Sequence, residues 1–312
     1  MNLVYMGTPP FAVPALKALC GSRHRVLAVV TGPDKPIGRG RKLQPTAVRA
    51  AAEELSLPAL APPSLRDAAL VEELREIGAE LFVVIAFRIL PEALFSLPPR
   101  GSINIHASLL PKYRGAAPIQ RALMNGESET GLSAFLLERT VDTGAVISQV
   151  TEQILPEDTY TTLAARLGEL AGGFLVSVVD RIESGEITPV EQDESQASPA
   201  PKIKAEDHRI NWAWPAGRIA NHIRALADSP GAVTAWRGKK IKVLGASVET
   251  DSGVGLAPGE ALINGRRILI GAGDGSVIKA LKLKPEGKKA LSAIDMINGE
   301  LIVSGEKLGE GT

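Results

Sequence analysis

The sequence predicts an α/β protein with a Rossmann-like N-terminal domain and a smaller C-terminal domain built from short strands. At 312 residues the chain exceeds the usual size of one domain. Its first residues read as strand, turn and helix, and apolar runs such as 81–86 are typical of strands buried between helix layers. Beyond residue 206, short β-like runs alternate with Gly-rich turns.

We place the domains at 1–186 and 206–312, with a linker at 187–205. The linker is polar, contains Pro and shows no hydrophobic periodicity, which is typical of an interdomain connection. A small barrel is the natural closure for the short strands of the C-terminal domain.

The N-terminal domain is expected to open with a strand at 3–6 and a helix at 11–20 that stops at Gly21. The turn between them lacks G-x-G-x-x-G, so a pyrophosphate cannot approach the backbone closely and a dinucleotide cofactor is disfavoured. No G-x-x-x-x-G-K-[ST] sequence occurs, so nucleotide hydrolysis is not supported. The next expected elements are a strand at 26–31, helices at 46–55 and 65–77, a strand at 81–86 and a short helix at 91–95.

The later elements follow from apolar spacing and from turn residues. Segments 132–137 and 145–151 alternate enough to be strands, and 160–182 reads as a long amphipathic helix capped by Asp158 or Thr159. The remaining expected elements are helices at 118–124 and 216–226 and strands at 240–244, 261–263, 267–270 and 276–283.

Composition limits the classes of protein to which this chain can belong. Hydrophobic residues make up 45% of the chain and charged residues 22%, close to globular averages. No apolar run approaches the ~18–20 residues that cross a bilayer, and the N-terminus does not read as a secretory signal. The single cysteine, Cys20, rules out an internal disulfide, and the four histidines show no metal-ligand spacing. We therefore expect a soluble cytoplasmic protein without a metal site, and we take it to be a monomer.

Charge is unevenly distributed, although the net charge is zero. Residues 1–200 hold 18 Lys/Arg and 23 Asp/Glu, whereas residues 201–312 hold 17 and 12. A net basic end indicates a nucleic-acid partner, but an ordinary solvated surface explains the charge alone equally well.

The stretch SINIHASLLPKYRG, 102–115, carries the strongest site signal. Ile103 and Ile105 alternate with Asn104 and His106, so on a strand the two polar side chains leave one face while the isoleucines enter a core. In open α/β sheets ligands bind beyond the carboxyl ends of the strands, where the loop after His106 lies. An Asn-x-His pair alone is often structural, because polar groups at strand ends bond to the next loop.

Neighbouring loops favour a functional interpretation. Arg114 stands in a Pro/Gly loop just downstream, and Asp142 follows the expected strand at 132–137, where its carboxylate can orient and charge the imidazole. The loop 31–45 is long, and its positive charges face only Asp34. That loop is either functional or simply solvated.

The residues Asn104-Ile105-His106 followed by SLLPKYRG, with the later Asp142-Thr143-Gly144, resemble the signature of the formyltetrahydrofolate-dependent formyltransferases. The chain is most similar to the members of that family that act on initiator methionyl-tRNA. The resemblance extends to MGTPPFAVPAL, GRGRKLQP, APKIKAEDHRINW and PEGKK, so it covers nearly all of the chain.

The resemblance implies transfer of the formyl group of 10-formyltetrahydrofolate, a cosubstrate, to the α-amino group of methionine on initiator methionyl-tRNA, in support of translation initiation. It also implies an OB-like, tRNA-binding barrel in the C-terminal domain. Asn104, His106 and Asp142 match the catalytic residues of the family. The expected folate-binding residues are Phe87, Arg88, Ser108, Leu109, Leu110 and Pro111. The expected tRNA-binding residues are Lys35, Arg39, Arg41, Lys42 and Arg114.

The three residue types suit this chemistry. Formyl transfer passes through a tetrahedral intermediate whose oxygen is negatively charged, so preorganised donors are the main requirement. Asn104 offers an amide N–H, and His106 offers a second donor that can hand a proton to the departing nitrogen. Asp142 keeps the imidazole cationic and takes the proton shed by the attacking amine, directly or through a water.

Three points stay open. Ala86-Phe87-Arg88 stands where the family commonly shows Ala-Tyr-Gly, which puts the affinity or fine specificity for the folate in doubt, but not the reaction class. Arg114 either fixes its loop by hydrogen bonds to carbonyls or meets the RNA. The alternative functions are a formyltransferase for an amino sugar or glycinamide ribonucleotide and a non-catalytic RNA-binding protein; the intact Asn104, His106 and Asp142 argue against the second.

Overall fold

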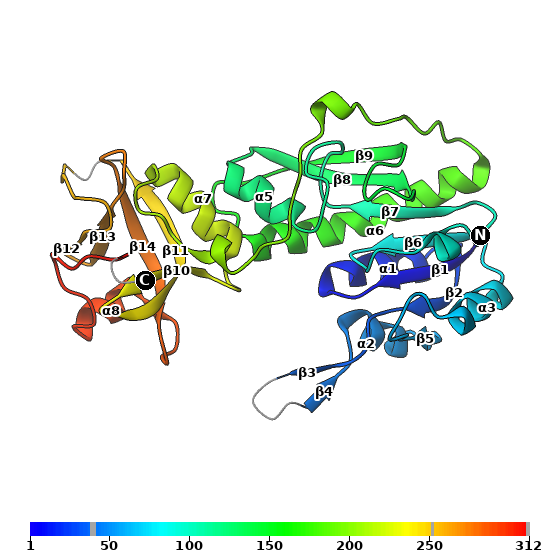
Figure 1. Ribbon diagram of the computed structural model, residues 1–312, viewed down its shortest axis with the longest axis horizontal. Coiled ribbons are helices and arrows are strands. Elements are labelled where there is room, and N and C mark those ends of the chain that lie inside the picture. The colour runs from blue at the N-terminus through cyan, green and yellow to red at the C-terminus, as the bar shows by residue number, and fades with distance from the viewer. Residues whose placement is uncertain (38–41, 251–252, 310–312) are drawn as a thin grey trace. The chain divides into compact units, whose positions relative to one another are not determined.

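The computed structural model describes residues 1–37, 42–250 and 253–309. It contains two compact units, whose elements are labelled in Figure 1. The first unit consists of Met1–Pro118, Glu129–Gln153 and Ala164–Pro201, and the second of Ile119–Ser128, Ile154–Leu163 and the chain from Lys202 onward. Residues 187–201, expected in the linker, thus belong to the first unit, and two short segments expected in the N-terminal domain belong to the second.

The first unit is built on one sheet. Its strands are β1 (Asn2–Gly7), β2 (Arg25–Val30), β5 (Ala59–Leu60), β6 (Leu81–Ile85), β7 (Ser102–His106), β8 (Glu129–Leu136) and β9 (Val146–Gln153). They lie in the order β5-β2-β1-β6-β7-β8-β9 (Figure 1). The first five run parallel, while β8 and β9 pair antiparallel. The order changes direction beside β1, and ligands bind at such switch points in open α/β sheets.

Helices cover the sheet of the first unit. They are the 3₁₀ turn η1 (Pro10–Ala12), α1 (Val13–Cys20), α2 (Ala47–Glu54), α3 (Ala68–Ile77), α4 (Glu92–Phe95) and most of α6 (Tyr160–Ser184). Leu70 and Leu74 of α3 and Leu94 of α4 are buried with Val4 and Val84 of the sheet. Burial of such side chains contributes roughly 1.5–3 kcal/mol each.

Side-chain caps set where two of the helices begin. Thr46 accepts a hydrogen bond from the backbone N–H of Arg49, and Asp67 accepts one from Ala69. These side chains accept hydrogen bonds from backbone N–H groups that have no partner inside the helix. Consequently α2 starts one residue and α3 three residues after the expected starts at 46 and 65.

Two glycines allow α6 to lie close to the start of the chain. A Cβ on Gly168 would lie 3.2 Å from the carbonyl oxygen of Phe11, and one on Gly172 would lie 3.2 Å from the Cβ of Ala18. Among the described residues α6 is the one helix long and apolar enough to cross a membrane by length and composition. The expectation of no such segment therefore needs correction; charged residues such as Arg166 interrupt the continuous run that was sought. Leu167 of α6 is fully buried, as befits a core helix.

The segment 31–45, expected to be a loop, contains a two-stranded hairpin. Its strands are β3 (Lys35–Ile37) and β4 (Lys42–Gln44), and they pair antiparallel, with Lys35 opposite Gln44. Pro36 lies within β3. Because Pro is uncommon inside strands, the sequence of this segment predicted a loop and not a strand. Residues 38–41 lie outside the described residues.

The second unit is β-rich, as expected. Its strands are β10 (Ala232–Trp236), β11 (Lys239–Glu249), β12 (Ala261–Asn264), β13 (Arg267–Gly271), β14 (Val277–Pro285) and β15 (Leu291–Ser292). They form an antiparallel sheet in the order β10-β11-β14-β13-β12, with β15 on β14. The unit also holds α7 (Ala216–Leu226), α8 (Ala293–Asn298) and all of α5 (Pro118–Asn125) after its first residue. Ile219 and Ile223 of α7 are buried with Ile241 and Ile278 of the sheet.

Candidate active site

Strand β7 places Asn104 and His106 on one face of the sheet. Ile103 and Ile105, between them, are 0% and 2% exposed, so the predicted alternation is confirmed. Pairing in register fixes the strand on both sides: Ile105 lies opposite Ile85 of β6, and His106 lies opposite Ser133 of β8. Both polar residues are therefore held by backbone pairing, independently of the loops.

His106 is buried, and its two ring nitrogens have different partners. Nε2 lies 2.8 Å from the backbone oxygen of Tyr113. A carbonyl oxygen only accepts hydrogen bonds, so Nε2 carries a proton and donates it to Tyr113. Nδ1 lies 3.8 Å from Oδ2 of Asp142. Nδ1 is thus the nitrogen that can gain or lose a proton, and it faces the carboxylate.

Asp142 stands in a loop of restricted backbone geometry. Its φ of 59° lies in the left-handed region, which is uncommon for residues other than Gly. Its Oδ2 accepts a hydrogen bond from the backbone N–H of Gly115, at 2.9 Å. Two residues on, a Cβ on Gly144 would lie 1.7 Å from the carbonyl oxygen of Leu136, so only glycine fits there. The loop therefore fixes the carboxylate beside the imidazole.

Asn104 has an unsatisfied side-chain oxygen. Among the described residues, its Oδ1 is one of few buried side-chain atoms without a hydrogen-bond partner. An unpaired buried polar group costs about 1–3 kcal/mol, so it marks a place where a ligand completes the bonding. The side-chain oxygen of Asn104 is therefore not committed to holding the fold.

The expected folate-binding residues meet at one edge of the sheet. Phe87 and Arg88 follow β6, and the segment Ser108 to Pro111 follows β7. Because β6 and β7 are adjacent and parallel, their carboxyl ends lie side by side, next to Asn104 and His106. Their contact with a folate stays a prediction.

A buried hydrogen-bond network that the sequence did not reveal holds the segment after β7. Ser133, fully buried on β8, accepts a hydrogen bond from the Leu110 N–H at 2.9 Å and donates one to the Ser108 carbonyl at 2.6 Å. Gln149 of β9 donates to the Leu110 carbonyl and to the Ser133 hydroxyl, both at 2.8 Å. A serine at an inward position of an apolar strand is the signal that could have indicated it.

Arg88, which replaces the usual Gly, turns toward neighbouring backbone. Its guanidinium donates to the carbonyl oxygens of Pro62 at 2.9 Å and Pro63 at 3.2 Å, and it stacks over the Phe87 ring at 5.2 Å. Burial lowers the pKa of Arg88 from its ordinary value. The side chain thus braces the loop after β5 against the loop after β6.

The expected tRNA-binding residues are only partly described. Lys35 is exposed on β3, and Lys42 begins β4. Arg39 and Arg41 lie outside the described residues. Asp34, the one acid in the sequence of this loop, pairs with Arg49 of α2 at 3.0 Å. Arg114, by contrast, is held within the first unit, where its guanidinium donates to Gln192 and Glu194.

Comparison with known proteins identifies the family. The formyl transferase profile matches residues 1–179, and the profile of the formyl transferase C-terminal domain matches residues 202–301. The methionyl-tRNA formyltransferase of Solibacter usitatus is 42% identical over 100% of this chain and 99% of its own length. The chain belongs to the methionyl-tRNA formyltransferase family. The member from Moorella thermoacetica is also 42% identical, over 99% of each chain.

A solved structure shows the same fold. The N-formyltransferase from Helicobacter canadensis, in complex with folinic acid and dTDP-3-aminofucose, superposes with a TM-score of 0.68. It covers 89% of this chain and 98% of its own, at 21% identity. The likeness supports the fold of the formyltransferases, with its parallel sheet and β-rich second domain, and carries no argument about the acceptor.

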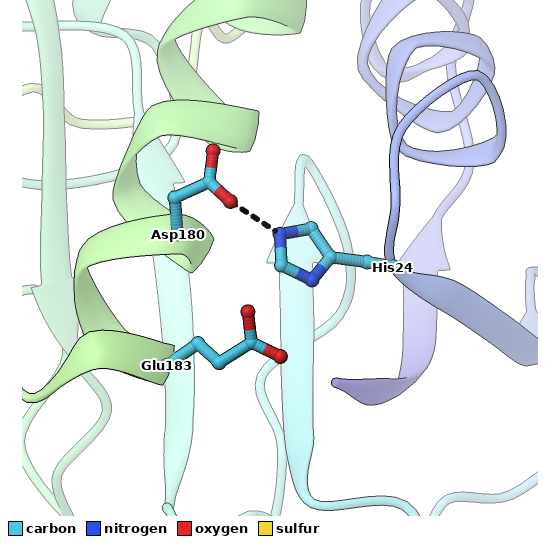
Figure 2. Close-up of side chains that lie close together, drawn as sticks. All are labelled: His24, Asp180 and Glu183. Carbon is cyan, nitrogen blue, oxygen red and sulfur yellow. Dashed lines mark ion pairs between the residues drawn. The ribbon is translucent and has the colours of Figure 1, made fainter.

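A cluster outside this family's motifs brings together groups that metals often use. His24, Asp180 and Glu183 each offer a ligand atom, and these atoms lie within 4.8 Å of one another (Figure 2). Two cations already neutralise the carboxylates: Arg23 pairs with both at 2.7 and 2.8 Å, and the Met1 ammonium pairs with Glu183 at 2.8 Å. We therefore assign the cluster a structural role, fastening the start of the chain to α6. Its members are far apart in sequence, so histidine spacing could not indicate it.

Proposed function

We propose that this protein transfers the formyl group of 10-formyltetrahydrofolate to the α-amino group of methionine on initiator methionyl-tRNA. The observation that carries the proposal is the placement of His106 Nδ1 beside Asp142, with Asn104, whose side-chain oxygen has no hydrogen-bond partner, on the same strand face. These groups occur in a chain 42% identical to a methionyl-tRNA formyltransferase over its whole length. Proposed with it are a cytoplasmic location and a monomeric state.

The chemistry follows from the geometry. The methionine amine attacks the formyl carbon, and the new oxyanion is stabilised by the Asn104 amide N–H and by Nδ1–H of a cationic His106. The proton of the amine passes to Asp142, whose Oδ2 is held by Gly115, directly or through a water. Collapse of the intermediate breaks the bond from carbon to the folate nitrogen, which takes the Nδ1 proton of His106. The products are the formylamide and tetrahydrofolate.

Recognition of the tRNA is proposed for two regions. The hairpin of β3 and β4 carries Lys35 and Lys42 at its strands, with Arg39 and Arg41 between them in the sequence. The second unit is proposed to close as an OB-like barrel, the type of fold that commonly binds nucleic acids. It contains a hollow of about 410 Å³ whose lining includes Arg209, Lys307 and Trp212. Basic side chains at such a hollow suit contact with phosphate groups.

A transfer assay with a panel of acceptors tests the proposal. The protein is incubated with formyl-labelled 10-formyltetrahydrofolate and, in separate reactions, methionyl initiator tRNA, methionyl elongator tRNA, an amino-sugar nucleotide and glycinamide ribonucleotide. We expect label on the methionyl initiator tRNA alone. Label on the sugar nucleotide or on glycinamide ribonucleotide instead would replace the proposed acceptor, and binding of tRNA with no transfer to any acceptor would point to a non-catalytic RNA-binding protein.

A further inference from the structure

Residues 190–200, expected to be a linker, lie along the loops that carry the proposed catalytic groups. Val190 pairs with Val146 at the start of β9, and Arg114 bridges to Pro199. The Ser198 hydroxyl accepts the N–H of Tyr113 at 2.9 Å. We call this segment the strap. The strap contacts Tyr113, whose carbonyl oxygen accepts the hydrogen bond of His106. It also contacts the loop of Asp142.

Gln192 is the residue of the strap that contacts the Asp142 loop. Its side-chain Nε2 donates to the backbone oxygen of Asp142 at 3.0 Å and to that of Gly144 at 2.8 Å. One amide group thereby satisfies the two carbonyls that flank Thr143. Asp142 keeps a left-handed backbone there, a conformation that persists only where surrounding contacts hold it.

Arg114 fixes the other end of the same amide. Its Nε and Nη2 donate to the Gln192 side-chain oxygen at 3.0 and 2.8 Å. Glu194 in turn binds Arg114 through both carboxylate oxygens, at 2.7 and 2.9 Å. The amide of Gln192 therefore cannot rotate without losing bonds at both ends, and it links the loop after β7 to the loop after β8.

We propose that Gln192 is a positioning residue for formyl transfer, which holds the Asp142 carboxylate at its place beside His106. The proposal rests on the function proposed above. The described hydrogen bonds of Gln192 to the Asp142 loop are to backbone carbonyls, so we expect its effect to be on the rate of the chemical step and not on the binding of either substrate. Misplacement of a reacting group by a fraction of an ångström is enough to slow such a step.

Two substitutions separate positioning from simple stability. Gln192→Ala removes both ends of the link. Gln192→Glu keeps an acceptor for Arg114 but sets a carboxylate oxygen against the carbonyls of Asp142 and Gly144. Gln196→Ala is the matched control, since Gln196 is exposed on the same strap and the described hydrogen bond of its amide goes to Asp193.

The measurement is kcat and KM for methionyl-tRNA and for the folate, in the wild-type and Asp142→Asn backgrounds. We expect either Gln192 variant to lower kcat about tenfold, equivalent to about 1.4 kcal/mol in the barrier, with both KM values within about twofold. In the Asp142→Asn background the further loss should vanish, because both changes act on one carboxylate. Gln196→Ala should match the wild type.

Three results would overturn the proposal: a kcat for Gln192→Glu within about twofold of wild type, a loss confined to KM, or a full tenfold loss that persists beside Asp142→Asn. Transfer by the wild type in the same assay distinguishes a failure of the positioning role from a failure of the proposed function. If the wild type transfers formyl and the Gln192 variants do so equally well, the positioning role fails and the function stands.

Discussion

The Nε2 atom of His106 lies 2.8 Å from the backbone oxygen of Tyr113. This contact assigns the tautomer, because the carbonyl requires a proton on Nε2 whatever the charge of the ring. Proton exchange with a substrate must then take place at Nδ1, which lies 3.8 Å from Asp142. That separation is longer than a hydrogen bond, so the carboxylate acts on the imidazole by its charge and remains available to an incoming amine.

Asp142→Asn should lower kcat by about two orders of magnitude or more, with the fold retained. The isosteric amide still accepts the Gly115 N–H, but it neither places a negative charge beside Nδ1 of His106 nor takes a proton. Single-turnover transfer measures the loss. The control is Asp67→Asn, because asparagine caps α3 as well as aspartate does and should leave the rate unchanged. A rate for Asp142→Asn within about threefold of wild type would remove its role in proton transfer.

Replacement of Arg39, Arg41 and Lys42 by alanine should raise KM for methionyl-tRNA and flatten its dependence on salt. Each phosphate contact that is lost releases roughly one counterion fewer, so the slope of log K against log salt falls by about 0.7–0.9 per contact. Titration of binding between low and moderate salt gives the slope, and KM for the folate should not change.

The control for that triple variant replaces three other basic residues of the first unit, Lys17, Arg66 and Arg75. They lie outside the hairpin, so KM for methionyl-tRNA and the salt slope should stay at wild-type values. If the hairpin variant also behaves as wild type, the loop is solvated surface with no part in tRNA binding.

Arg88→Gly should destabilise the protein by about 1–2 kcal/mol, because it removes the hydrogen bonds to the Pro62 and Pro63 carbonyls. It should leave kcat near the wild-type value, since Arg88 makes no contact with His106, Asn104 or Asp142 among the described contacts. Urea unfolding and single-turnover rates check the two parts. An unchanged stability with a large change in kcat would place Arg88 in the reaction instead of in the scaffold.

His222 of α7 should make the second unit less stable in acid. Burial lowers its pKa from 6.5 to about 4. The unfolded chain therefore takes up a proton as pH falls below about 6.5, while the folded chain does so only near pH 4. Stability is highest above pH 6.5 and falls through this window, by about 2 kcal/mol at pH 5.

Urea unfolding at pH 7 and pH 5, followed by a signal from the second unit, measures that loss. His222→Gln, which has no charge to gain, should show a pH 7 to pH 5 difference smaller by about 2 kcal/mol. An equal difference in both proteins, or an NMR titration of His222 near pH 6.5, would show that its burial does not depress the pKa.

Much of the site could be predicted because it depends on a local rule. The alternation of Ile103 and Ile105 with Asn104 and His106 fixes which side chains share a face, and pairing to β6 and β8 preserves it. The sequence did not show that residues 119–128 and 154–163 belong to the second unit, because they read as ordinary parts of the first domain. The unit that each segment joins is decided by contacts with residues distant in sequence, such as the ion pair of Arg121 with Asp207 at 3.0 Å.

The strap and the strands β3, β4 and β10 escaped prediction for different reasons. Gln192 lies in a polar segment without periodicity, and the hydrogen bonds that give it a role join it to Asp142 and Arg114, 50 and 78 positions away in the sequence. Strand β10 has only five residues, too few for an alternating pattern to be recognised on its own, and it forms because β11 pairs along it. The hairpin of β3 and β4 was hidden by the Gly and Pro of its sequence.

The measurement that tests the central claim most directly is the single-turnover rate of formyl transfer to methionyl initiator tRNA by Asn104→Ala, with both substrates saturating. The Asn104 carboxamide oxygen has no partner in the described fold, so its removal should cost no stability and act on the transition state alone. We predict a rate lower by about 10²–10³, an unchanged affinity for the folate and an unfolding midpoint no lower than that of the wild type, with the exposed Asn298→Ala as a control that equals wild type. A rate within about threefold of wild type would contradict the assignment of this strand face as the site of formyl transfer.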